Sequence, residues 1–367
     1  MKVPFIDLKA QFEALEADIR AAIDRVLAHG QYIMGPEVAE MELALAELTG
    51  ARHCIAVASG TEALLISLMA LGVGPGDEVI VPAFTFAATA EVVLLVGATP
   101  VLVDVEPDTA NIDVRQVEGV VTDRTRAIIP VALYGQAADM DELNAIAAKR
   151  GLCVIEDAAQ SFGAEYRGHK SCNLSRIGCT SFFPSKPLGC YGDGGAIFTN
   201  DDELATACRE IRVHGQSRRY HHTRIGVGGR MDTLQCAIVL AKLKRFEWEI
   251  ERRIALGQRY NRLLDEAGIR RIVQRSDRNS VFAQYTVIVD GRDRITEILD
   301  ASGIPTAVHY PGPLNSQPAY SDKAIAGPLP VSEHLASSVL SLPMHPYLDE
   351  ELQDRIVENL TSAVKKN

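Results

Sequence analysis

The sequence lacks several features that would assign it to a special class of protein. Its 367 residues contain no apolar run of about 18 residues, the length that crosses a bilayer, and the N-terminus has no apolar signal-like stretch. Basic residues are in deficit, 37 against 48 acidic ones, and the net charge of −11 disfavours sequence-independent binding of nucleic acid. Internal repeats and low-complexity tracts are also missing. We therefore expect a cytoplasmic globular protein with neither a nucleic-acid nor a membrane partner.

Paired metal-binding or disulfide-forming residues are missing too. The seven cysteines are odd in number and none belongs to a Cys-x-x-Cys motif, so neither a disulfide framework nor a zinc site is expected. Adjacent His221 and His222 have no carboxylate or cysteine at ligand spacing, and we predict no metal site. Gly-Val-Gly-Gly at 226–229 lacks the full dinucleotide fingerprint, which disfavours a nicotinamide site.

What the sequence does contain is an alternation of short apolar strands and amphipathic helices. Two helices are expected at 10–29 and 36–49, because apolar residues recur at helical spacing and a glycine follows each segment. The order strand, helix, strand then repeats, which predicts an α/β fold with a mostly parallel sheet and helices on both faces. The expected strands lie at 54–58, 78–81, 100–103, 127–132, 152–156, 178–183 and 195–199, and further helices at 62–71, 85–96, 139–150 and 203–212.

A change of pattern in the last third predicts a second domain. A long helix at 231–250 becomes charged in its later half and leads out of the first unit. The remainder of the chain is typical of a smaller α+β unit. We expect a large domain at 1–245 and a small C-terminal domain at 246–367. The elements expected in the small domain are a strand at 284–289, a helix at 295–302 and a terminal helix from about 349.

The segment from Cys179 to Thr199 places one lysine in a loop suited to close approach of a ligand. Pro184 and Pro187 bracket Lys186 and fix the backbone angles around it, and four glycines follow within nine residues. An isolated lysine in such a loop is more often a solvated surface residue. The loop by itself leaves both interpretations open.

Small and acidic residues follow other predicted strands. Ser59-Gly60-Thr61 stands between a strand and a helix, which either aims free amides at an anion or is an ordinary helix cap. Asp157 follows an apolar strand, and Glu156 is its rival, because side chains alternate and only one of the two can face a shared pocket. Ligands of such sheets gather at the carboxyl ends of the strands, so these residues and Lys186 are consistent with one site.

One stretch, between Glu210 and Asp232, contains no acidic residue. Arginine forks match phosphate and carboxylate oxygens, so the stretch fits an anionic ligand such as a sugar nucleotide diphosphate or a carboxylate. The alternative is that the stretch is a solvated flexible loop. The basic residues and histidines of the stretch are Arg212, His214, Arg218, Arg219, His221, His222, Arg224 and Arg230.

The loop around Lys186 resembles the active-site segment of the pyridoxal phosphate (PLP) sugar aminotransferases of the DegT/DnrJ/EryC1/StrS family, where Ser-Phe-x-x-x-Lys supplies the Schiff-base lysine. Ser181 and Lys186 match that motif. The resemblance covers nearly the whole chain and implies the fold of the PLP-dependent aspartate aminotransferase type (fold type I), with PLP bound by the large domain. Further family motifs recur in order: Phe5-Ile-Asp-Leu8, Ser59-Gly-Thr-Glu-Ala63, Phe84-Thr-Phe-Ala-Ala-Thr89, Glu156-Asp-Ala-Ala-Gln160, Arg230-Met-Asp232, His309-Tyr310 and Leu342-Pro-Met-His345.

The resemblance implies a role for each candidate residue. Lys186 is the expected catalytic residue, which binds PLP and then moves a proton between the substrate carbon and the cofactor. Asp157, rather than Glu156, is expected to keep the pyridine nitrogen protonated. The other implied cofactor contacts are phosphate binding by Gly60, Thr61 and Ser181, ring stacking by Phe86, and a hydrogen bond from Gln160 to the phenolic oxygen.

Substrate-binding positions of the family also have matches. Arg230, His309 and Tyr310 correspond to positions near the sugar, some of them reached across a dimer interface, so the resemblance implies a homodimer with shared active sites. Gly228 stands where the family has an asparagine that reaches the neighbouring subunit's phosphate. Either a backbone amide replaces that contact or the phosphate is held less firmly.

The implied reaction is a ping-pong transamination with L-glutamate as amino donor. The segments 184–191, 216–222 and 305–311 are most similar to the branch that aminates UDP-2-acetamido-2-deoxy-3-oxo-glucuronate on the route to bacterial O-antigen lipopolysaccharide sugars. A uronate carboxylate would account for the basic stretch. The alternatives are a 4-aminotransferase for a 4-keto-6-deoxy nucleotide sugar and a non-catalytic PLP-binding regulatory protein. The dehydratase branch is disfavoured, because it has histidine in place of Lys186.

Overall fold

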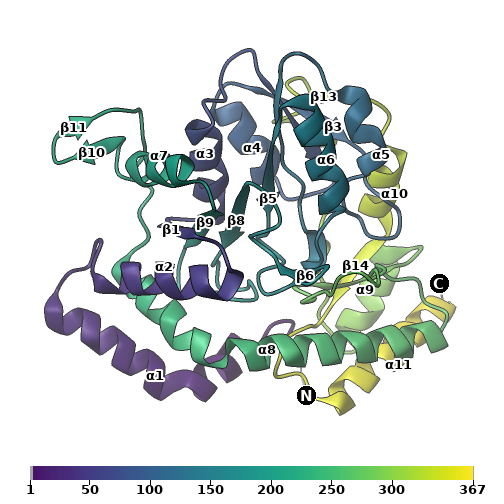
Figure 1. Ribbon diagram of the computed structural model, residues 1–367. Coiled ribbons are helices and arrows are strands. Elements are labelled where there is room, and N and C mark those ends of the chain that lie inside the picture. The colour runs from purple at the N-terminus through teal and green to yellow at the C-terminus, as the bar shows by residue number, and fades with distance from the viewer. Residues whose placement is uncertain (1–2, 367) are drawn as a thin grey trace.

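The computed structural model describes residues 3–366 and is built around one large sheet (Figure 1). Within those residues the sheet has eight strands, of which only β9 runs antiparallel to its neighbours. The predicted α/β fold with a mostly parallel sheet is therefore confirmed. In spatial order the strands are β1 (His53–Val57), β9 (Gly195–Thr199), β8 (Ile177–Ser181), β5 (Cys153–Asp157), β4 (Thr125–Ile128), β2 (Glu78–Pro82), β3 (Thr99–Val103) and β13 (Ile325–Ala326).

Alternate residues of the strands pack into cores on opposite faces of the sheet. In β2, Val79 and Val81 pack with α3, α4 and α7, whereas Ile80 packs with α6 on the other face. Both faces of this strand are therefore apolar, as expected of a parallel strand between helices. The helices are α1 (Leu8–His29), α2 (Pro36–Thr49), α3 (Gly60–Ala70), α4 (Ala88–Leu95), α5 (Val114–Val117), α6 (Met140–Arg150), α7 (Asp202–Arg212), α8 (Thr233–Glu266), α9 (Arg292–Ala301), α10 (Pro330–Ser338) and α11 (Glu350–Lys366).

The two N-terminal helices end where the sequence predicts. Gly30 and Gly50 follow α1 and α2 with φ angles of 70° and 73°, in the left-handed region that glycine adopts without strain. The amide of Gly30 donates to the carbonyl of Val26 and closes the last turn of α1. Along α1, Leu15 and Ile19 pack against α8. This first helix is therefore fixed to the element that carries the chain toward its C-terminus.

The helix α8 passes through two separate cores. Its first part, including Phe246, packs with α2 and the sheet edge formed by β1 and β9. Its last part, including Leu256 and Leu264, packs with the antiparallel pair β12 (Tyr285–Ile288) and β14 (Val339–Leu342), and with α9 and α11. The expected domain boundary at 245/246 falls inside this continuous helix and stays a prediction. Within residues 3–366, no helix is both long and apolar enough to span a membrane.

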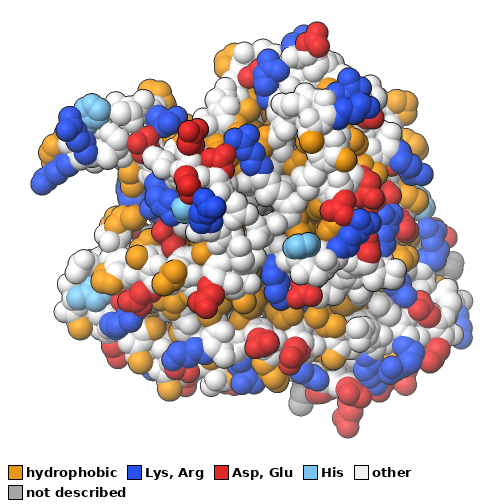
Figure 2. Space-filling model, viewed as in Figure 1, with side chains coloured by type: hydrophobic (Ala, Val, Ile, Leu, Met, Phe, Trp, Pro, Cys, Tyr) orange, Lys and Arg blue, Asp and Glu red, His pale blue; other side chains and the backbone are white. Residues whose placement is uncertain are grey.

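The middle of the basic stretch, residues 216–222, forms a hairpin that projects from the body of the molecule (Figure 1). Its strands are β10 (Gln216–Arg218) and β11 (His221–His222), which pair antiparallel. Lys or Arg side chains and a histidine cover the projection in Figure 2. Two large apolar side chains are also exposed, Tyr220 between the two strands at 80% and Ile225 just after them at 85%. These strands were not expected from the sequence.

Candidate active site

Two neighbouring parallel strands bring Asp157 and Lys186 together. Asp157 is the last residue of β5 and stands opposite Cys179 of β8, and Lys186 lies in the loop that leaves β8. The charges of Asp157 and Lys186 influence each other's ionisation. The expectation that strand ends converge at one edge of the sheet therefore holds for this pair.

The side-chain amine of Lys186 has no hydrogen-bond or ion-pair partner in the described residues. The backbone N–H of Lys186 donates to the carbonyl of Phe183 at 2.9 Å, which closes a tight turn. Burial lowers the pKa of Lys186, and the negative charge of Asp157 offsets part of that shift. The lowered pKa favours the neutral amine, which is the form that attacks carbonyls and accepts protons.

The two acidic residues at the end of β5 have separate surroundings. Asp157 accepts a hydrogen bond from the Thr89 hydroxyl and one from the amide of Ala159, both at 3.1 Å. Burial raises the pKa of Asp157, whereas these bonds and Lys186 lower it. Glu156 points elsewhere: Ser171 and backbone amides of the following segment donate to its carboxylate at 2.8 to 3.3 Å. Asp157 is therefore the residue of this pair that faces the lysine.

The turn before α3 lies against the end of β8. Ser59 caps α3 by accepting from the amide of Glu62 at 3.0 Å, so the amides of Gly60 and Thr61 have no acceptor inside the helix. A Cβ atom added to Gly60 would lie 2.7 Å from the Cβ of Ser181. Only glycine allows this approach, which sets the Ser181 hydroxyl beside the helix N-terminus. The arrangement suits an anion such as a phosphate.

The ring of Phe86 and the amide of Gln160 both lie beside Tyr310. Phe86 is 56% exposed, unusual for phenylalanine, and its ring centroid is 6.0 Å from that of Tyr310. The buried Gln160 donates through Nε2 to the Tyr310 hydroxyl at 3.2 Å and accepts from the amide of Tyr134 at 2.8 Å. Its second Nε2 hydrogen is left for a ligand.

The charge of Lys186 acts on His309, whereas no interaction with Lys186 is found for Arg230 in the described residues. Burial lowers the pKa of His309, and the charge of Lys186 lowers it further, so the ring is neutral at pH 7. Its Nδ1 lies 3.0 Å from the Ser341 hydroxyl. Arg230 follows Gly229, whose carbonyl accepts from the backbone beside the α3 turn. In the described part of the chain the Arg230 side chain has no ion-pair partner, and no contact joins it to Lys186.

Three polar residues of α8 near the lysine loop were not predicted. Lys242 donates to the carbonyl of Gly189 at 2.6 Å, and burial lowers its pKa to about 8. Glu249 and Arg253 are buried farther along the helix. All three occur at intervals of three or four residues with the buried Phe246, so the helical period could have identified them.

The residues of this site fit PLP. The cofactor requires an amine for covalent attachment, a carboxylate for its ring nitrogen, a cradle for its phosphate and an apolar face for its ring. Lys186 offers an unpaired amine, Asp157 a buried carboxylate and Phe86 an exposed ring. The close approach of Gly60 to Ser181 puts free amides and a hydroxyl where a phosphate could bind.

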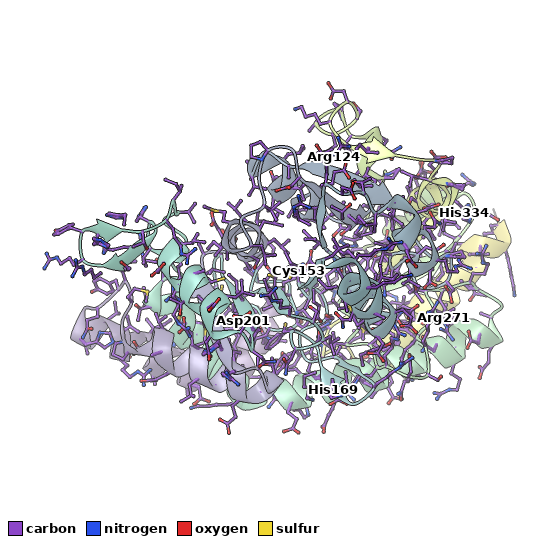
Figure 3. The ribbon with its side chains drawn as sticks, turned by 45° about the horizontal axis from the view of Figure 1, so that its top comes forward. Arg124, Cys153, His169, Asp201, Arg271 and His334 are labelled. Atoms are coloured by element: carbon purple, nitrogen blue, oxygen red, sulfur yellow. The ribbon has the colours of Figure 1, made fainter. Side chains whose placement is uncertain are left out.

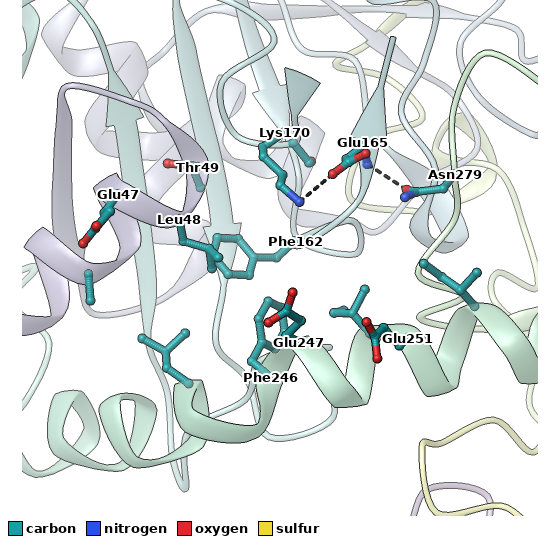
Figure 4. Close-up of a pocket in the computed structure, with 16 residues that line it drawn as sticks. Glu47, Leu48, Thr49, Phe162, Glu165, Lys170, Phe246, Glu247, Glu251 and Asn279 are labelled. Atoms are coloured by element: carbon teal, nitrogen blue, oxygen red, sulfur yellow. Dashed lines mark hydrogen bonds and ion pairs between the residues drawn. The ribbon is translucent and has the colours of Figure 1, made fainter. Parts of the chain in front are cut away.

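A cavity separate from the site around Lys186 is lined by none of the predicted site residues (Figure 4). It measures about 500 Å³ and lies between α2, α8 and the segment around Phe162. Phe162 and Phe246 form part of its wall, and Lys170 pairs with Glu165 at 2.6 Å at its edge. Size alone therefore does not identify the reactive site in this chain.

Known proteins share the whole length of this chain. Residues 13–361 match the DegT/DnrJ/EryC1/StrS aminotransferase family. The chain is 60% identical over 347 residues to the UDP-2-acetamido-2-deoxy-3-oxo-D-glucuronate aminotransferase of Pseudomonas aeruginosa, covering 95% of this chain and 96% of that protein. It is also 46% identical over 364 residues to the "Pleiotropic regulatory protein" of Geobacillus stearothermophilus, covering 98% of each.

Solved structures show the same fold and a bound cofactor. A DegT DnrJ EryC1 StrS aminotransferase from Brucella abortus superposes with a TM-score of 0.96 at 47% identity, covering 98% of this chain and 99% of that one. NtdA from Bacillus subtilis, solved with bound cofactor PMP, superposes with a TM-score of 0.91 at 34% identity, covering 99% of this chain and 85% of that one. The chain therefore belongs to the DegT/DnrJ/EryC1/StrS family and is a PLP-dependent aminotransferase.

Proposed function

We propose that this enzyme transfers the amino group of L-glutamate to C3 of UDP-2-acetamido-2-deoxy-3-oxo-D-glucuronate. The observation that carries the proposal is the 60% identity, over almost the whole of both chains, to the P. aeruginosa aminotransferase named for this sugar. The product is an amino sugar nucleotide, and we place its use in lipopolysaccharide O-antigen synthesis and the enzyme in the cytoplasm.

Lys186 and Asp157 carry the chemistry in this proposal. PLP, when bound, supplies an electron sink that acidifies the substrate C–H bond. The neutral Nζ of Lys186 accepts the proton from the substrate carbon and returns a proton in the second half of the reaction. The Asp157 carboxylate keeps the proton on the ring nitrogen, and the Thr89 hydroxyl fixes the orientation of that carboxylate.

The remaining cofactor contacts fix its position. The free amides of Gly60 and Thr61 and the Ser181 hydroxyl bind the phosphate, with the N-terminus of α3 favouring its negative charge. Phe86 packs against the ring, because its exposed face is available to an apolar partner. The free Nε2 hydrogen of Gln160 donates to the phenolic oxygen, while its other contacts prevent rotation of the amide.

Arg230, His309 and Tyr310 bind the sugar in this proposal. A neutral His309 can donate to or accept from a sugar hydroxyl without attracting the phosphates. Arg230 has no acidic partner in the described residues and is available for a carboxylate. At Gly228 an added Cβ would lie 3.3 Å from the ring of His214, an exposed side chain, so the family's asparagine fits here once that ring moves slightly.

We also propose a homodimer with shared active sites. Tyr220 is exposed in the turn of a projecting basic hairpin and Ile225 is exposed just after it, which suits contact with a second copy of the chain. Sedimentation equilibrium should give twice the monomer mass of 39.8 kDa. A mass equal to that of the monomer at micromolar concentration would contradict the shared site.

One experiment tests the reaction. With added PLP, the protein should show a visible absorbance band that L-glutamate bleaches and the 3-oxo-uronate nucleotide restores. Restoration only by a 4-keto-6-deoxy nucleotide sugar would preserve the mechanism and replace the substrate. A regulatory role, suggested by the name of the G. stearothermophilus relative, requires specific nucleic-acid binding near physiological salt and no restoration by either sugar.

Arg230→Ala is expected to raise KM for the uronate substrate at least ~10-fold, because a charge-assisted bond to a carboxylate contributes about 1.5 to 3 kcal/mol. KM for a neutral 3-keto nucleotide sugar should change much less. Arg224→Ala is the matched control, since Arg224 lies in the same segment but pairs with Glu210 at 2.8 Å. Equal losses for both sugars would show that Arg230 does not recognise the carboxylate.

A further inference from the structure

A small polar cavity lies next to the loop that carries Lys186. Three parts of the chain that are distant in sequence meet there: residues 6–11, the segment 184–186, and the segment 345–347 together with Arg253 of α8. About 10 Å³ is available to the centre of a water molecule, which is room for about one water. Ser185 lines the cavity and makes no hydrogen bond within the described residues.

Buried polar atoms without partners gather around this cavity. They are Oε1 of Gln11, Nε of Arg253 and both ring nitrogens of His345. The three side chains are only 8%, 4% and 2% exposed, and each lines the cavity. Buried polar groups without partners are rare and costly, so their occurrence in three residues that line one cavity points to a missing partner.

Hydrogen bonds fix the orientation of Gln11, Arg253 and Tyr347 around the cavity. Nε2 of Gln11 donates to both oxygens of Glu249, at 3.0 and 2.8 Å, which turns its Oε1 away from that carboxylate. Arg253 donates through Nη1 to the carbonyl of Phe282 at 3.2 Å. Tyr347 donates to Glu249 at 2.9 Å. The unpartnered atoms of Gln11 and Arg253 are therefore not a consequence of free rotation.

The missing partner must both donate and accept. Burial lowers the pKa of His345 to about 4, so the ring is neutral at pH 7 and has one donor and one acceptor nitrogen. The groups that influence this ring are Asp7, Arg253, Asp349 and the Pro4 carbonyl. The Pro4 carbonyl is an acceptor for the N–H of this ring, so the cavity offers one donor, Nε of Arg253, and two acceptors, Oε1 of Gln11 and the other ring nitrogen. Water suits this set, whereas a cation would be repelled by Arg253 and an anion would leave the acceptors unpaired.

We propose that an ordered water molecule occupies this cavity and links His345, Arg253 and Gln11 to the 184–186 segment, and that His345 is thereby a positioning residue for Lys186. The water fixes the loop of the large sheet against the segment that follows β14 and against α8. The positioning role rests on the proposed function, whereas the bound water does not.

The water is tested directly in the unaltered protein. A crystal structure at about 1.5 Å should show a density peak within 2.7–3.2 Å of Arg253 Nε and of Gln11 Oε1 or a His345 nitrogen. An empty cavity, a bound ion, or side chains that bond one another directly would overturn the proposal. This readout needs neither substrate nor activity.

A pair of variants tests the contribution of His345. His345→Leu removes the ring nitrogens and is expected to lower Tm by at least ~2 °C, because the water is lost and Arg253 and Gln11 are left unpaired. His345→Gln keeps a donor and an acceptor and should retain most of Tm. His334→Leu is the control, at an exposed histidine of α10 (Figure 3). A higher Tm in His345→Leu would mean that the histidine ring had been buried without a hydrogen-bond partner, so that removing its nitrogens stabilised the fold. That result would overturn the bound water.

The positioning role has its own readout. In the PLP-loaded enzyme, the pH midpoint of the cofactor absorbance should shift in His345→Leu and return toward its original value in His345→Gln. A lowered Tm with an unchanged midpoint and unchanged kcat would overturn the positioning role and leave the water in place. Loss of the absorbance band in the unaltered protein would contradict the proposed function alone, since the crystallographic water is measured without the cofactor.

Discussion

Lys186→Ala is expected to lower kcat for transamination at least ~10³-fold, to the limit of detection. In the proposed mechanism, the alanine variant loses the amine that holds PLP covalently and that moves the proton at the substrate carbon. Its phosphate cradle and ring contacts are intact, so PLP should still bind. The measurement is product formation by chromatography over hours, with PLP in excess.

Two variants control for charge and folding in this experiment. Lys186→Arg keeps a cation in the loop but cannot form the imine, and it should be as inactive as the alanine variant. Lys170→Ala removes a lysine of the strand β7 (His169–Lys170) that pairs with Glu165 at 2.6 Å, and it should leave kcat within about 2-fold. Steady-state turnover by either Lys186 variant would remove this residue from the mechanism.

Local sequence patterns were sufficient for most of the fold. Helices α1 and α2 have a capping residue or Pro at the start and glycine at the end, so their bounds follow from neighbouring residues alone. The extent of α8 was underestimated, because charged residues after 246 obscured a buried stripe that continues through Leu256 and Leu264. The strand β13 was missed, since two exposed residues add to β3 from far along the chain.

The site was only partly accessible to the same reasoning. The rule that parallel strands end at one edge is enough to place Asp157 near Lys186. It does not predict that Gln160 contacts Tyr310, 150 residues away, or that Thr89 holds Asp157. Those contacts depend on how the C-terminal segment and α4 return to the sheet, which no local pattern encodes.

The basic stretch shows a second limit of the sequence pattern. Arg212, one of its residues, is 4% exposed, pairs with Glu42 at 2.5 Å and donates to the carbonyl of Ala56. Arg224 pairs with Glu210. Both cations are therefore neutralised by acids outside or at the edge of the stretch, and only part of its positive charge is free for a ligand.

Asp157→Asn is expected to lower kcat about 10²- to 10³-fold with little loss of PLP binding. An amide is the same size as a carboxylate, but it cannot stabilise a protonated ring nitrogen, so the electron sink weakens. The fold should tolerate the change, because the hydroxyl of Thr89 can accept from the new amide as well as donate. The measurement is kcat together with the cofactor content of the purified variant. A variant with unchanged kcat would show that Asp157 is not the partner of the ring nitrogen.

Glu156→Gln separates this electrostatic effect from the loss of any buried carboxylate. Glu156 is the adjacent residue, and burial raises its pKa from 4.5 to about 7. The native state therefore keeps a proton that the unfolded chain releases, and the contribution of Glu156 to stability falls as pH rises between 4.5 and 7. Glutamine does not titrate, so Tm of the variant relative to the unaltered protein should rise from about pH 5 to about pH 7.5.

Since Glu156 faces away from Lys186, kcat of the folded variant should stay within about 3-fold of the unaltered value. A kcat loss in Glu156→Gln as large as in Asp157→Asn would mean that both substitutions lower kcat by distorting the end of β5. The loss in Asp157→Asn would then not report on the charge of Asp157. The pair of variants therefore decides whether the alternation of side chains along β5 selects one carboxylate for chemistry and the other for the core.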